Sequence, residues 1–381
     1  EYSDYLGRIG VGRIYNGRVK AGEQVSMIKE DGSVVKGRIA KLFTFHGLKK
    51  VEAESAEAGE IVAIAGFATA NVGDTIASLE APVALHRVKI DEPTMKMAFL
   101  VNDSPFAGQE GKFVTSRQLR SRLFHELETN VSLRVDETDN TDTFIVSGRG
   151  ELHLGILIET MRREGYEFQV SRPEVICKEI DGVTNEPFER LFIDVPDDYT
   201  GAVMNEMGPR KGELQNMGVE GNMAVLEFIV PTRGMIGFRS EFLRLTKGNG
   251  IMNHAFLEYR PWCGEIARQR NGALVAWEEG TTTAYALGKA EDRGFFFVTP
   301  QTHVYSGMIV GEHNRTQDLD INVCKVKQLT NMRSASAEVL YTLQAPVEMG
   351  LEKCLEYIHD DELVEVTPKS VRMRKRQITR R

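Results

Sequence analysis

Two glycine–lysine pairs in this chain could take part in nucleotide chemistry. A phosphate-binding loop requires such a pair within the pattern GxxxxGK[ST]. In such a loop, backbone N–H groups cradle the phosphates while the lysine and the hydroxyl meet phosphate and magnesium. The chain has Gly111-Lys112 and Gly288-Lys289, but neither pair is followed by serine or threonine or preceded by a glycine at the required spacing. The GRIGVG string at Gly7 lies inside a strand-like pattern, which favours a β-turn or barrel corner over a dinucleotide site. The sequence therefore predicts no phosphate-binding loop in this chain.

Nucleophilic and metal-binding side chains are equally scattered. Ser147 stands in VSGRG, which lacks the GxSxG frame of a nucleophile elbow. The four cysteines lie far apart, without the spacing of a zinc or redox motif, and none of the eight histidines forms an HxxxH or HExxH pair. We expect no catalytic residue, no metal site and no cofactor in this chain, and reduced thiols typical of a cytoplasmic protein.

One cluster keeps an enzymatic alternative open. Glu312, His313, Arg315 and Asp318 crowd a short segment of the C-terminal region. Such titratable groups could serve a small-molecule enzyme, although a turn tied by side-chain hydrogen bonds explains them as well. A further alternative is a protein-interaction scaffold, which the acidic composition would suit and which would bind its partner independently of salt.

Charge is distributed unevenly along the chain. The formal net charge of -8 argues against a protein that coats nucleic acid non-specifically. Acidic residues dominate 352–362, whereas lysine and arginine dominate 365–381. This asymmetry is typical of a protein that meets phosphate with one end only. Apolar runs such as the one at Phe296 are far too short to cross a bilayer, so we expect no membrane partner.

Basic residues in two C-terminal stretches and on one interior segment are the candidate RNA contacts. In the loop 324–338, small polar residues would let the chain approach RNA while cations meet phosphate. In VRMRKRQITRR, arginines alternate as on one face of an extended strand. An ordinary exposed loop and a solvated tail are the competing interpretations. The predicted RNA-binding residues are Lys325, Lys327, Asn331, Arg333, Arg372, Arg374, Lys375, Arg376, Arg210, Lys211, Arg239 and Lys247.

Local patterns predict a multi-domain α+β fold that positions these residues. Residues 1–85 alternate short β-branched runs with turn pairs such as Asn16-Gly17 and Asp31-Gly32, which predicts hairpins closing into a small β-barrel. Residues 92–171 and 173–259 each show the order βαββαβ, which predicts two tandem ferredoxin-like domains. The third-strand signature of base-stacking RNA-recognition motifs is missing from both, so contact through loops and edges is favoured.

The remaining residues, 260–381, predict a mixed α/β C-terminal domain whose fold the pattern does not name. Strand-like runs alternate there with a helix beginning near Pro346, because proline suits a first helical turn. Leu351, Leu355 and Ile358 would form the buried face of that helix.

Several strings resemble the translational GTPases of the elongation factor G group. SGRGELHLGILIETMRREGYEFQVSRPEV resembles the end of their domain III, PFERLFIDVP to IMNHAFLEY their domain V, and the N-terminal strands their domain II. TRGMIGFRSEF and GMIVGEHNRTQDLDINVCKVKQLTNMRS resemble the BipA/TypA family within that group, as does the region from Arg260 onward. The domain IV of elongation factor G has no counterpart, since Val170 runs almost directly into the next module.

This resemblance implies the ribosome-binding part of a GTPase linked to large-subunit assembly and to growth under cold or stress. The implied partners are the large ribosomal subunit, ribosomal RNA and transfer RNA, the last reached by the loop from Lys325 to Arg333, and a monomer is expected off the ribosome. GTP and magnesium would belong to a preceding G domain that this chain lacks, and the start at Glu1 fits such a cut. We therefore expect no enzymatic activity from the chain itself and a cytoplasmic location.

Overall fold

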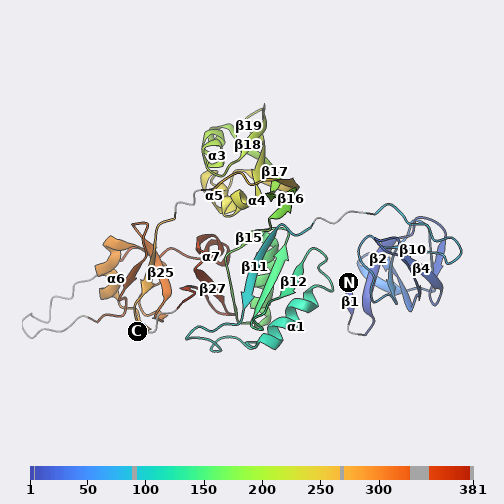
Figure 1. The fold of residues 1–381 in the computed structure, drawn as a ribbon, viewed down its shortest axis with the longest axis horizontal. Helices are drawn as coiled ribbons and strands as arrows, with labels where there is room; N and C mark the ends of the chain where they lie inside the picture. The colour runs from blue at the N-terminus through green and yellow to red at the C-terminus, as the bar shows by residue number, and fades with distance from the viewer. Residues whose placement is uncertain (4, 88–91, 267–269, 327–342, 378–381) are drawn as a thin grey trace, which may run out of the picture. The chain divides into compact units, whose positions relative to one another are not determined.

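A computed structural model describes residues 1–3, 5–87, 92–266, 270–326 and 343–377 of the chain (Figure 1). It is a mixed α/β multi-domain structure with two compact units, Glu1–Glu92 with Ser121–Arg134 and Pro93–Arg120 with Val135–Arg381. The predicted division into four domains is finer than this and remains a prediction. Within the described ranges, no helix combines the length and the apolar character needed to span a bilayer.

The first unit consists of short antiparallel strands around an apolar core that includes Met27, Leu42 and Val62. One sheet has the order β1 (Tyr2–Ser3), β2 (Gly7–Arg13), β9 (Ile61–Ala65), β6 (Lys41–His46) and β7 (Lys49–Glu52). The others are β10 (Thr75–Ala77), β4 (Gln24–Ile28) and β5 (Val34–Arg38), and the pair β3 (Arg18–Lys20) with β8 (Ser55–Glu57).

The two predicted hairpin turns in this unit have different outcomes. Asp31-Gly32 links β4 to β5, which pair with each other, and Gly32 has the positive φ of 77° that such a turn requires. The hairpin predicted at Asn16-Gly17 is wrong. Gly17 also has a positive φ, but β2 pairs with β9 and β3 pairs with β8, so this turn passes the chain from one sheet to another.

A second large sheet runs through most of the other unit. Its strand order is β12-β13-β11-β14-β27-β28-β25-β21-β26, with β15 beside β11 and β23 beside β25. The N-terminal half comes from β11 (Met95–Leu100), β12 (Arg134–Glu137), β13 (Thr143–Gly148), β14 (Phe168–Val170) and β15 (Glu174–Val175), with helices α1 (Ser116–Glu126) and α2 (Glu151–Glu164) between them in sequence. Leu154, Ile158 and Met161 of α2 are buried, as their helical spacing predicts.

The C-terminal half of the same sheet comes from residues 273–375. The strands are β21 (Ala273–Ala276), β23 (Gly294–Phe296), β25 (Met308–His313), β26 (Leu319–Ile321), β27 (Glu362–Val366) and β28 (Val371–Lys375). Beside them lie β22 (Gly280–Thr281), β24 (His303–Val304), α6 (Ala284–Ala290), η2 (Glu291–Arg293) and α7 (Leu351–Tyr357). The helix predicted from Pro346 begins later, at Leu351, with Gly350 as its N-cap residue, and it buries Leu355.

One ladder joins the two halves into a continuous sheet. β14 pairs antiparallel with β27, with Phe168 opposite Val366 and Val170 opposite Val364. Because the pairing brings together residues almost two hundred positions apart, no local pattern indicated it. The predicted domains 92–171 and 260–381 therefore share one hydrogen-bonded sheet.

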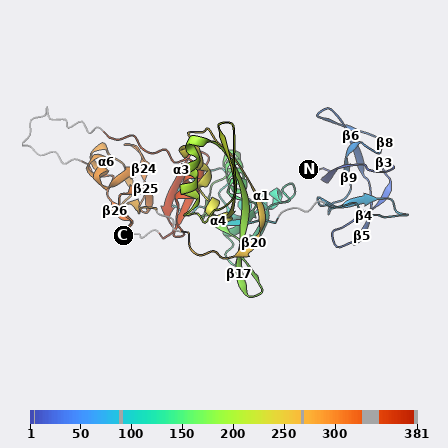
Figure 2. The same ribbon diagram turned by 90° about the horizontal axis from the view of Figure 1, so that it is seen from above.

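Residues 178–261 form a separate sheet covered on one face by helices (Figures 1 and 2). The strands pair in the order β18-β19-β17-β20, with β16 also on β17. The elements are β16 (Lys178–Ile180), β17 (Val183–Pro196), η1 (Asp197–Tyr199), α3 (Thr200–Met207), β18 (Glu213–Glu220), β19 (Met223–Pro231), α4 (Thr232–Met235), α5 (Phe238–Leu245) and β20 (Ile251–Pro261). The buried core includes Leu191, Leu226, Phe228 and Phe242.

A histidine–carboxylate pair spans β17 and β20 of this sheet. His254 Nδ1 lies 2.5 Å from Glu189 Oε2, and the Glu189 side chain is almost fully buried while that of His254 is half exposed. The hydrogen bond to Glu189 raises the pKa of His254 above its usual 6.5, against the opposing effects of burial and of Arg239. The protonated pair should therefore stabilise the fold at low pH.

We expect the stability of this module to fall as pH rises through the folded pKa of His254. A raised pKa means that the stabilisation is complete below the unfolded value of about 6.5 and is lost above the folded value. Urea unfolding midpoints at pH 6 and pH 8 should differ more for the unmodified chain than for His254→Gln. His46→Gln, which changes an exposed histidine in the other unit, should leave the difference unaltered.

Candidate nucleic-acid interface

Arg374 lies inside the large sheet rather than on its surface. Its strand, β28, pairs with β27 on one side and β25 on the other. The Arg374 side chain is 2% exposed, and its Nε donates to Gln169 Oε1 at 2.7 Å while Nη2 pairs with Asp103. A phosphate could not reach this guanidinium without displacing partners from the first half of the sheet.

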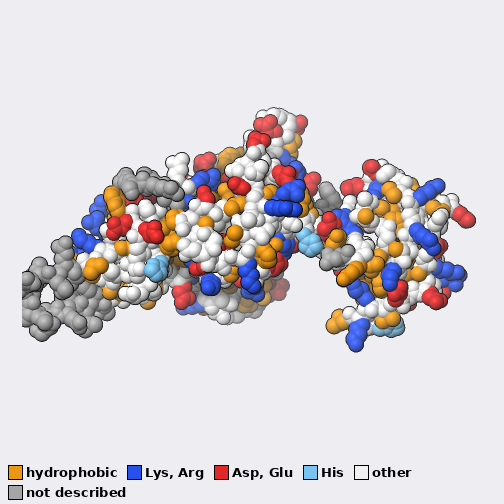
Figure 3. Space-filling model, turned by 90° about the horizontal axis from the view of Figure 1, so that it is seen from below, with side chains coloured by type: hydrophobic (Ala, Val, Ile, Leu, Met, Phe, Trp, Pro, Cys, Tyr) orange, Lys and Arg blue, Asp and Glu red, His pale blue; other side chains and the backbone are white. Residues whose placement is uncertain are grey.

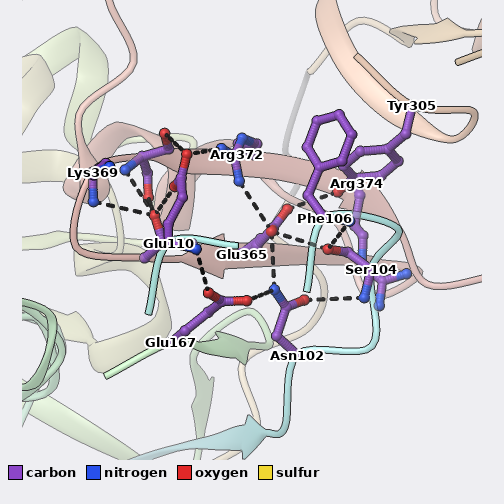
Figure 4. Close-up of polar contacts among 12 residues, drawn as sticks. Asn102, Ser104, Phe106, Glu110, Glu167, Tyr305, Glu365, Lys369, Arg372 and Arg374 are labelled. Carbon is purple, nitrogen blue, oxygen red and sulfur yellow. Dashed lines mark hydrogen bonds and ion pairs between the residues drawn. The ribbon is translucent and has the colours of Figure 1, made fainter. Parts of the chain in front are cut away.

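Arg372 belongs to a buried polar network at the same joint (Figure 4). Its guanidinium pairs with Glu110 Oε1 at 2.6 Å and with Glu365 Oε1 at 3.1 Å. Burial opposes the ionisation of Glu110, but hydrogen bonds from Thr367 and the charge of Arg372 outweigh it and lower the pKa of that carboxyl. Arg372 thus neutralises two carboxylates, one from a loop after β11 and one from β27.

Glu365 is the centre of this network. It is fully buried and accepts hydrogen bonds from Asn102 Nδ2 and Ser104 Oγ, both at 3.0 Å, and from Tyr305 O–H at 2.9 Å. Burial, with the negative charge of Glu365, raises the pKa of Tyr305 well above its usual value, so the phenol stays a donor. These hydrogen bonds connect the loop that follows β11 to the C-terminal half of the sheet.

Lys375 is held by three carboxylates. Its Nζ lies 2.5 Å from Asp318, 3.0 Å from Asp361 and 2.7 Å from Glu362. Burial would lower its pKa, but these carboxylates raise it, so the ammonium is retained. Glu362 also binds Arg270 in a bidentate pair at 2.6 and 3.0 Å.

Arg210 is the fourth predicted RNA contact that serves the fold instead. Its Nη1 donates to the carbonyl oxygens of Gly234 and Ile236 at 2.8 and 3.0 Å, and its Nε pairs with Glu206 at 2.8 Å. These bonds hold the turn between α4 and α5. Our interpretation of four residues must therefore be corrected, because their charges are used within the chain: Arg210, Arg372, Arg374 and Lys375.

Five other predicted residues are exposed. Arg239 lies in the first turn of α5 with the 46% exposed Leu243 one helical turn further on, and Lys247 lies in the turn that follows the helix. Lys211 and Lys247 both have a positive φ, in turns that follow α3 and α5. The other exposed positions are Lys325 and Arg376.

One described segment ends within the predicted loop, at Val326. Lys327, Asn331 and Arg333 lie outside the described residues. At the start of the loop, the carbonyl oxygen of Lys325 accepts a hydrogen bond from Thr283 Oγ1 at 2.7 Å, so the backbone is anchored while the side chain is exposed. In Figure 3, lysine and arginine side chains are interspersed with aspartate and glutamate rather than gathered in one basic patch. Any phosphate contacts on that face would thus be discrete.

The turn 312–318 has a structural explanation. His313 is 8% exposed and its Nδ1 lies 2.6 Å from the Gln317 carbonyl oxygen, while Asp318 accepts from the Ala273 N–H at 2.7 Å and pairs with Lys375. The Arg315 carbonyl oxygen accepts from the Gly272 N–H. These bonds favour a closed turn over a small-molecule active site.

A hollow of about 380 Å³ beside this turn holds charges that are already paired. Its lining includes Asp318 and Asp361, which pair with Lys375, and Asp360, which pairs with Arg172. Across the described part of the chain, no group of three or more His, Cys, Asp or Glu could hold a metal ion.

Comparison with known families and proteins matches three parts of the chain. Residues 7–77 match the family model "Elongation factor Tu domain 2", residues 183–270 match "Elongation factor G C-terminus", and residues 271–380 match "TypA/BipA C-terminal domain". A protein of Synechocystis sp. is 60% identical over 98% of this chain, and one of Bacillus subtilis is 54% identical over 99%. Both are named "Large ribosomal subunit assembly factor BipA". This chain belongs to the TypA/BipA family.

The family relatives are longer than the chain. A third relative, from Salmonella typhimurium and of the same name, is 48% identical over 100% of this chain. The chain spans only 62–63% of the length of these three relatives. A crystal structure of a Thermus thermophilus protein aligns with 68% of this chain and 54% of its own, at 18% identity and a TM-score of 0.40, a likeness too low to support an argument.

The motif TRGMIGFRSEF, which carried part of the resemblance to the TypA/BipA family, lies at a junction of three segments. Gly237 has a φ of 73°, and its N–H points to Glu151 Oε2 of α2 at 3.3 Å. Ser240 Oγ donates to Glu356 Oε1 of α7 at 2.7 Å. The two glutamates, Glu151 and Glu356, lie far from this motif in sequence, so no local sequence pattern indicates their contacts with it.

Proposed function

We propose that this chain is the ribosome-binding part of a translational GTPase that acts in large-subunit assembly and in adaptation to cold or stress. The observation that carries the proposal is the 60% identity over 98% of the chain with a protein named "Large ribosomal subunit assembly factor BipA". In this role the chain contacts ribosomal RNA and transfer RNA in the cytoplasm and is a monomer off the ribosome. A small-molecule enzyme is not favoured, because the turn 312–318 is internally bonded.

GTP hydrolysis would reside in a part of the longer relatives that this chain does not span. The described residues do not fit the nucleotide and its magnesium ion, since they contain no metal-binding cluster and the sequence has no GxxxxGK[ST] loop. The chain's own role is then binding without catalysis, and no step of hydrolysis is assigned to its residues.

The finer architecture supports such a role. The strand orders β12-β13-β11-β14 and β18-β19-β17-β20 are those expected of two ferredoxin-like domains, at 92–171 and 173–259. The match to "Elongation factor Tu domain 2" supports a β-barrel at 1–85. Residues 260–381 would be the family-specific domain, built onto the first ferredoxin-like sheet through β27.

The exposed cations are the proposed phosphate contacts. Arg239 on α5, Lys247 in the turn after it and Lys211 in the turn after α3 are all exposed on one module. Their side chains can approach an RNA backbone directly. Arg372 and Arg374, in contrast, would first have to break internal ion pairs. Lys325 and Arg376, with the residues Lys327, Asn331 and Arg333 of the loop, remain proposed contacts to transfer RNA or ribosomal RNA.

Charge reversal on the α5 side should weaken ribosome binding and reduce its dependence on salt. We expect Lys211→Glu, Arg239→Glu and Lys247→Glu together to flatten the plot of log affinity against log salt by roughly one unit per lost phosphate contact. Co-sedimentation of the chain with purified large subunits over a salt series measures both quantities. The triple reversal of Lys325, Lys327 and Arg333 tests the loop in the same way.

The controls reverse cations that we do not assign to RNA. Arg163→Glu and Lys353→Glu also change exposed side chains and should leave the salt dependence unaltered. Unchanged affinity and slope in both triple variants would rule out these contacts. Binding that does not vary with salt even in the unmodified chain would favour a protein-interaction scaffold.

A further inference from the structure

The strand β18 is an open edge of its sheet. Among the strands that the structure describes, β18 pairs with β19 and with no other. All eight of its residues are exposed. An edge of this length leaves a row of backbone N–H and C=O groups available for pairing with another extended chain.

One side of this edge is apolar. Leu214, Met217 and Val219 lie opposite the core residues Phe228, Leu226 and Ala224 of β19, and opposed residues in a ladder point to the same face. The three side chains therefore project on the helix-covered side of the sheet. They are nevertheless 40%, 48% and 57% exposed, so the helices do not cover them. A strand added here would bury them with its own apolar side chains.

The other side of the edge is acidic. Glu213 and Glu220 lie opposite Ile229 and Met223, and Asn216 lies opposite Glu227, so these carboxylates project on the open face. Arg190 pairs with Glu227 at 3.4 Å, and Arg260 approaches Glu213 at 3.7 Å. Glu220 extends the negative charge to the far end of the strand. Because Arg190 and Arg260 already pair with Glu227 and Glu213, the carboxylate that a neighbouring strand would meet is that of Glu220, which favours a basic side chain beside it.

β18 also lacks two devices by which proteins usually block an open edge. Its sequence, ELQNMGVE, has no lysine and no proline. It does contain a register shift between Leu214 and Asn216, a bulge of the kind that discourages pairing. From Asn216 to Glu220 the ladder is regular, so that five-residue stretch is the part that could accept a partner.

We propose that β18 accepts an extended segment of a partner protein in which apolar and basic residues alternate. The apolar residues pack on Met217 and Val219, and a basic residue faces Glu220 on the open face. This interaction is separate from the proposed RNA contacts, because the cations lie on and beside α5 while β18 carries no cation. The edge selects polypeptide over RNA, since phosphates would meet the carboxylates.

The test uses the whole 381-residue chain and a defined probe. The probe is a fluorescein-labelled peptide that alternates lysine with valine and is N-methylated along one edge, so that it cannot stack on itself. Fluorescence anisotropy should show saturable binding, and Met217→Lys with Val219→Lys should weaken it about tenfold or more. Hydrogen exchange should slow at the backbone amides of 216–220 when the peptide binds.

Matched controls separate this edge from the other surfaces. Ile251→Lys changes a 61% exposed residue on β20, the opposite edge strand, and should leave binding unchanged. A peptide alternating glutamate with valine should bind far more weakly. Circular dichroism melting checks that each variant folds, and exposed positions should tolerate these changes.

Four results would overturn the proposal. Equal binding of the glutamate peptide would remove the argument from charge, and a loss of binding in Ile251→Lys but not in the double variant would place the site on β20. Concentration-dependent self-association that disappears in the double variant would show that the occupant is a second copy of the chain. Weaker binding of an RNA oligonucleotide by the double variant would assign the edge to nucleic acid.

Discussion

Glu365→Ala should destabilise the joint between the two halves of the large sheet by about 3–5 kcal/mol, because it removes one partner of a buried ion pair and leaves the other partners in place. Arg372 keeps Glu110 but loses the second carboxylate. Asn102, Ser104 and Tyr305 are buried, and each loses a hydrogen-bond acceptor. No single surface ion pair of this chain should have an effect of that size.

Fluorescence of Trp277 reports on this prediction, since that tryptophan follows β21 in the same sheet. In a Trp262→Phe background, the Glu365→Ala variant should unfold at a lower urea concentration. Glu348→Ala, which changes an exposed carboxylate outside the network, should unfold at the original midpoint. If the two variants unfold alike, the network in Figure 4 contributes little to the joint.

Local patterns predicted the secondary structure of the two βαββαβ segments well. Leu154, Ile158 and Met161 recur at helical spacing in the first of them, and the helix observed there, Glu151–Glu164, buries all three. The period of 3.6 residues is a property of the chain within a few turns, so it can be read without knowing the partner surface. Strands such as MAVLEFIVP can also be recognised from their local pattern, and this one is observed as Met223–Pro231.

The role of the C-terminal arginines could not be predicted in this way. Alternation along VRMRK suggested an exposed basic face, but β28 is an interior strand with neighbours on both sides. Arg372 pairs with Glu110 and Arg374 with Asp103, and both of these carboxylates are more than 250 residues away in sequence. The ladder between β14 and β27 joins the two halves of the sheet from which these groups come.

A local signal for this burial was nevertheless present. Glu365 sits between Val364 and Val366 in a strand whose five residues are all buried, ELVEV. A carboxylate in such a run needs a buried cation or several donors, because an isolated buried charge is strongly unfavourable. The alternating arginines a few residues later were the nearest candidate cations. An ion pair with Glu365 was therefore a better prediction for them than phosphate binding.

Glu186→Ala should destabilise the module of residues 178–261 by about 3–5 kcal/mol, through the loss of a second buried pair. Glu186 on β17 is fully buried, and its carboxylate binds Arg233 at 2.5 and 3.0 Å. Arg233 lies in α4 and stacks 3.7 Å above the Trp262 ring. Burial would lower the pKa of Arg233, but the hydrogen bond and charge of Glu186 raise it. Since an arginine side chain remains protonated in proteins, Glu186→Ala would leave a largely buried cation without its carboxylate.

Replacing both partners separates a true ion-pair penalty from a loss of packing. The double variant Glu186→Leu with Arg233→Met removes both charges. We expect it to regain most of the stability that Glu186→Ala loses, because a buried ion pair can be replaced by apolar residues at little net cost. Trp262 fluorescence in a Trp277→Phe background follows the transition. The backbone N–H of Cys263, which donates to Glu186 at 3.0 Å, would still lack its acceptor, so recovery should stop short of complete. A double variant as unstable as Glu186→Ala would show that the pair itself contributes a net stabilisation that apolar packing cannot replace.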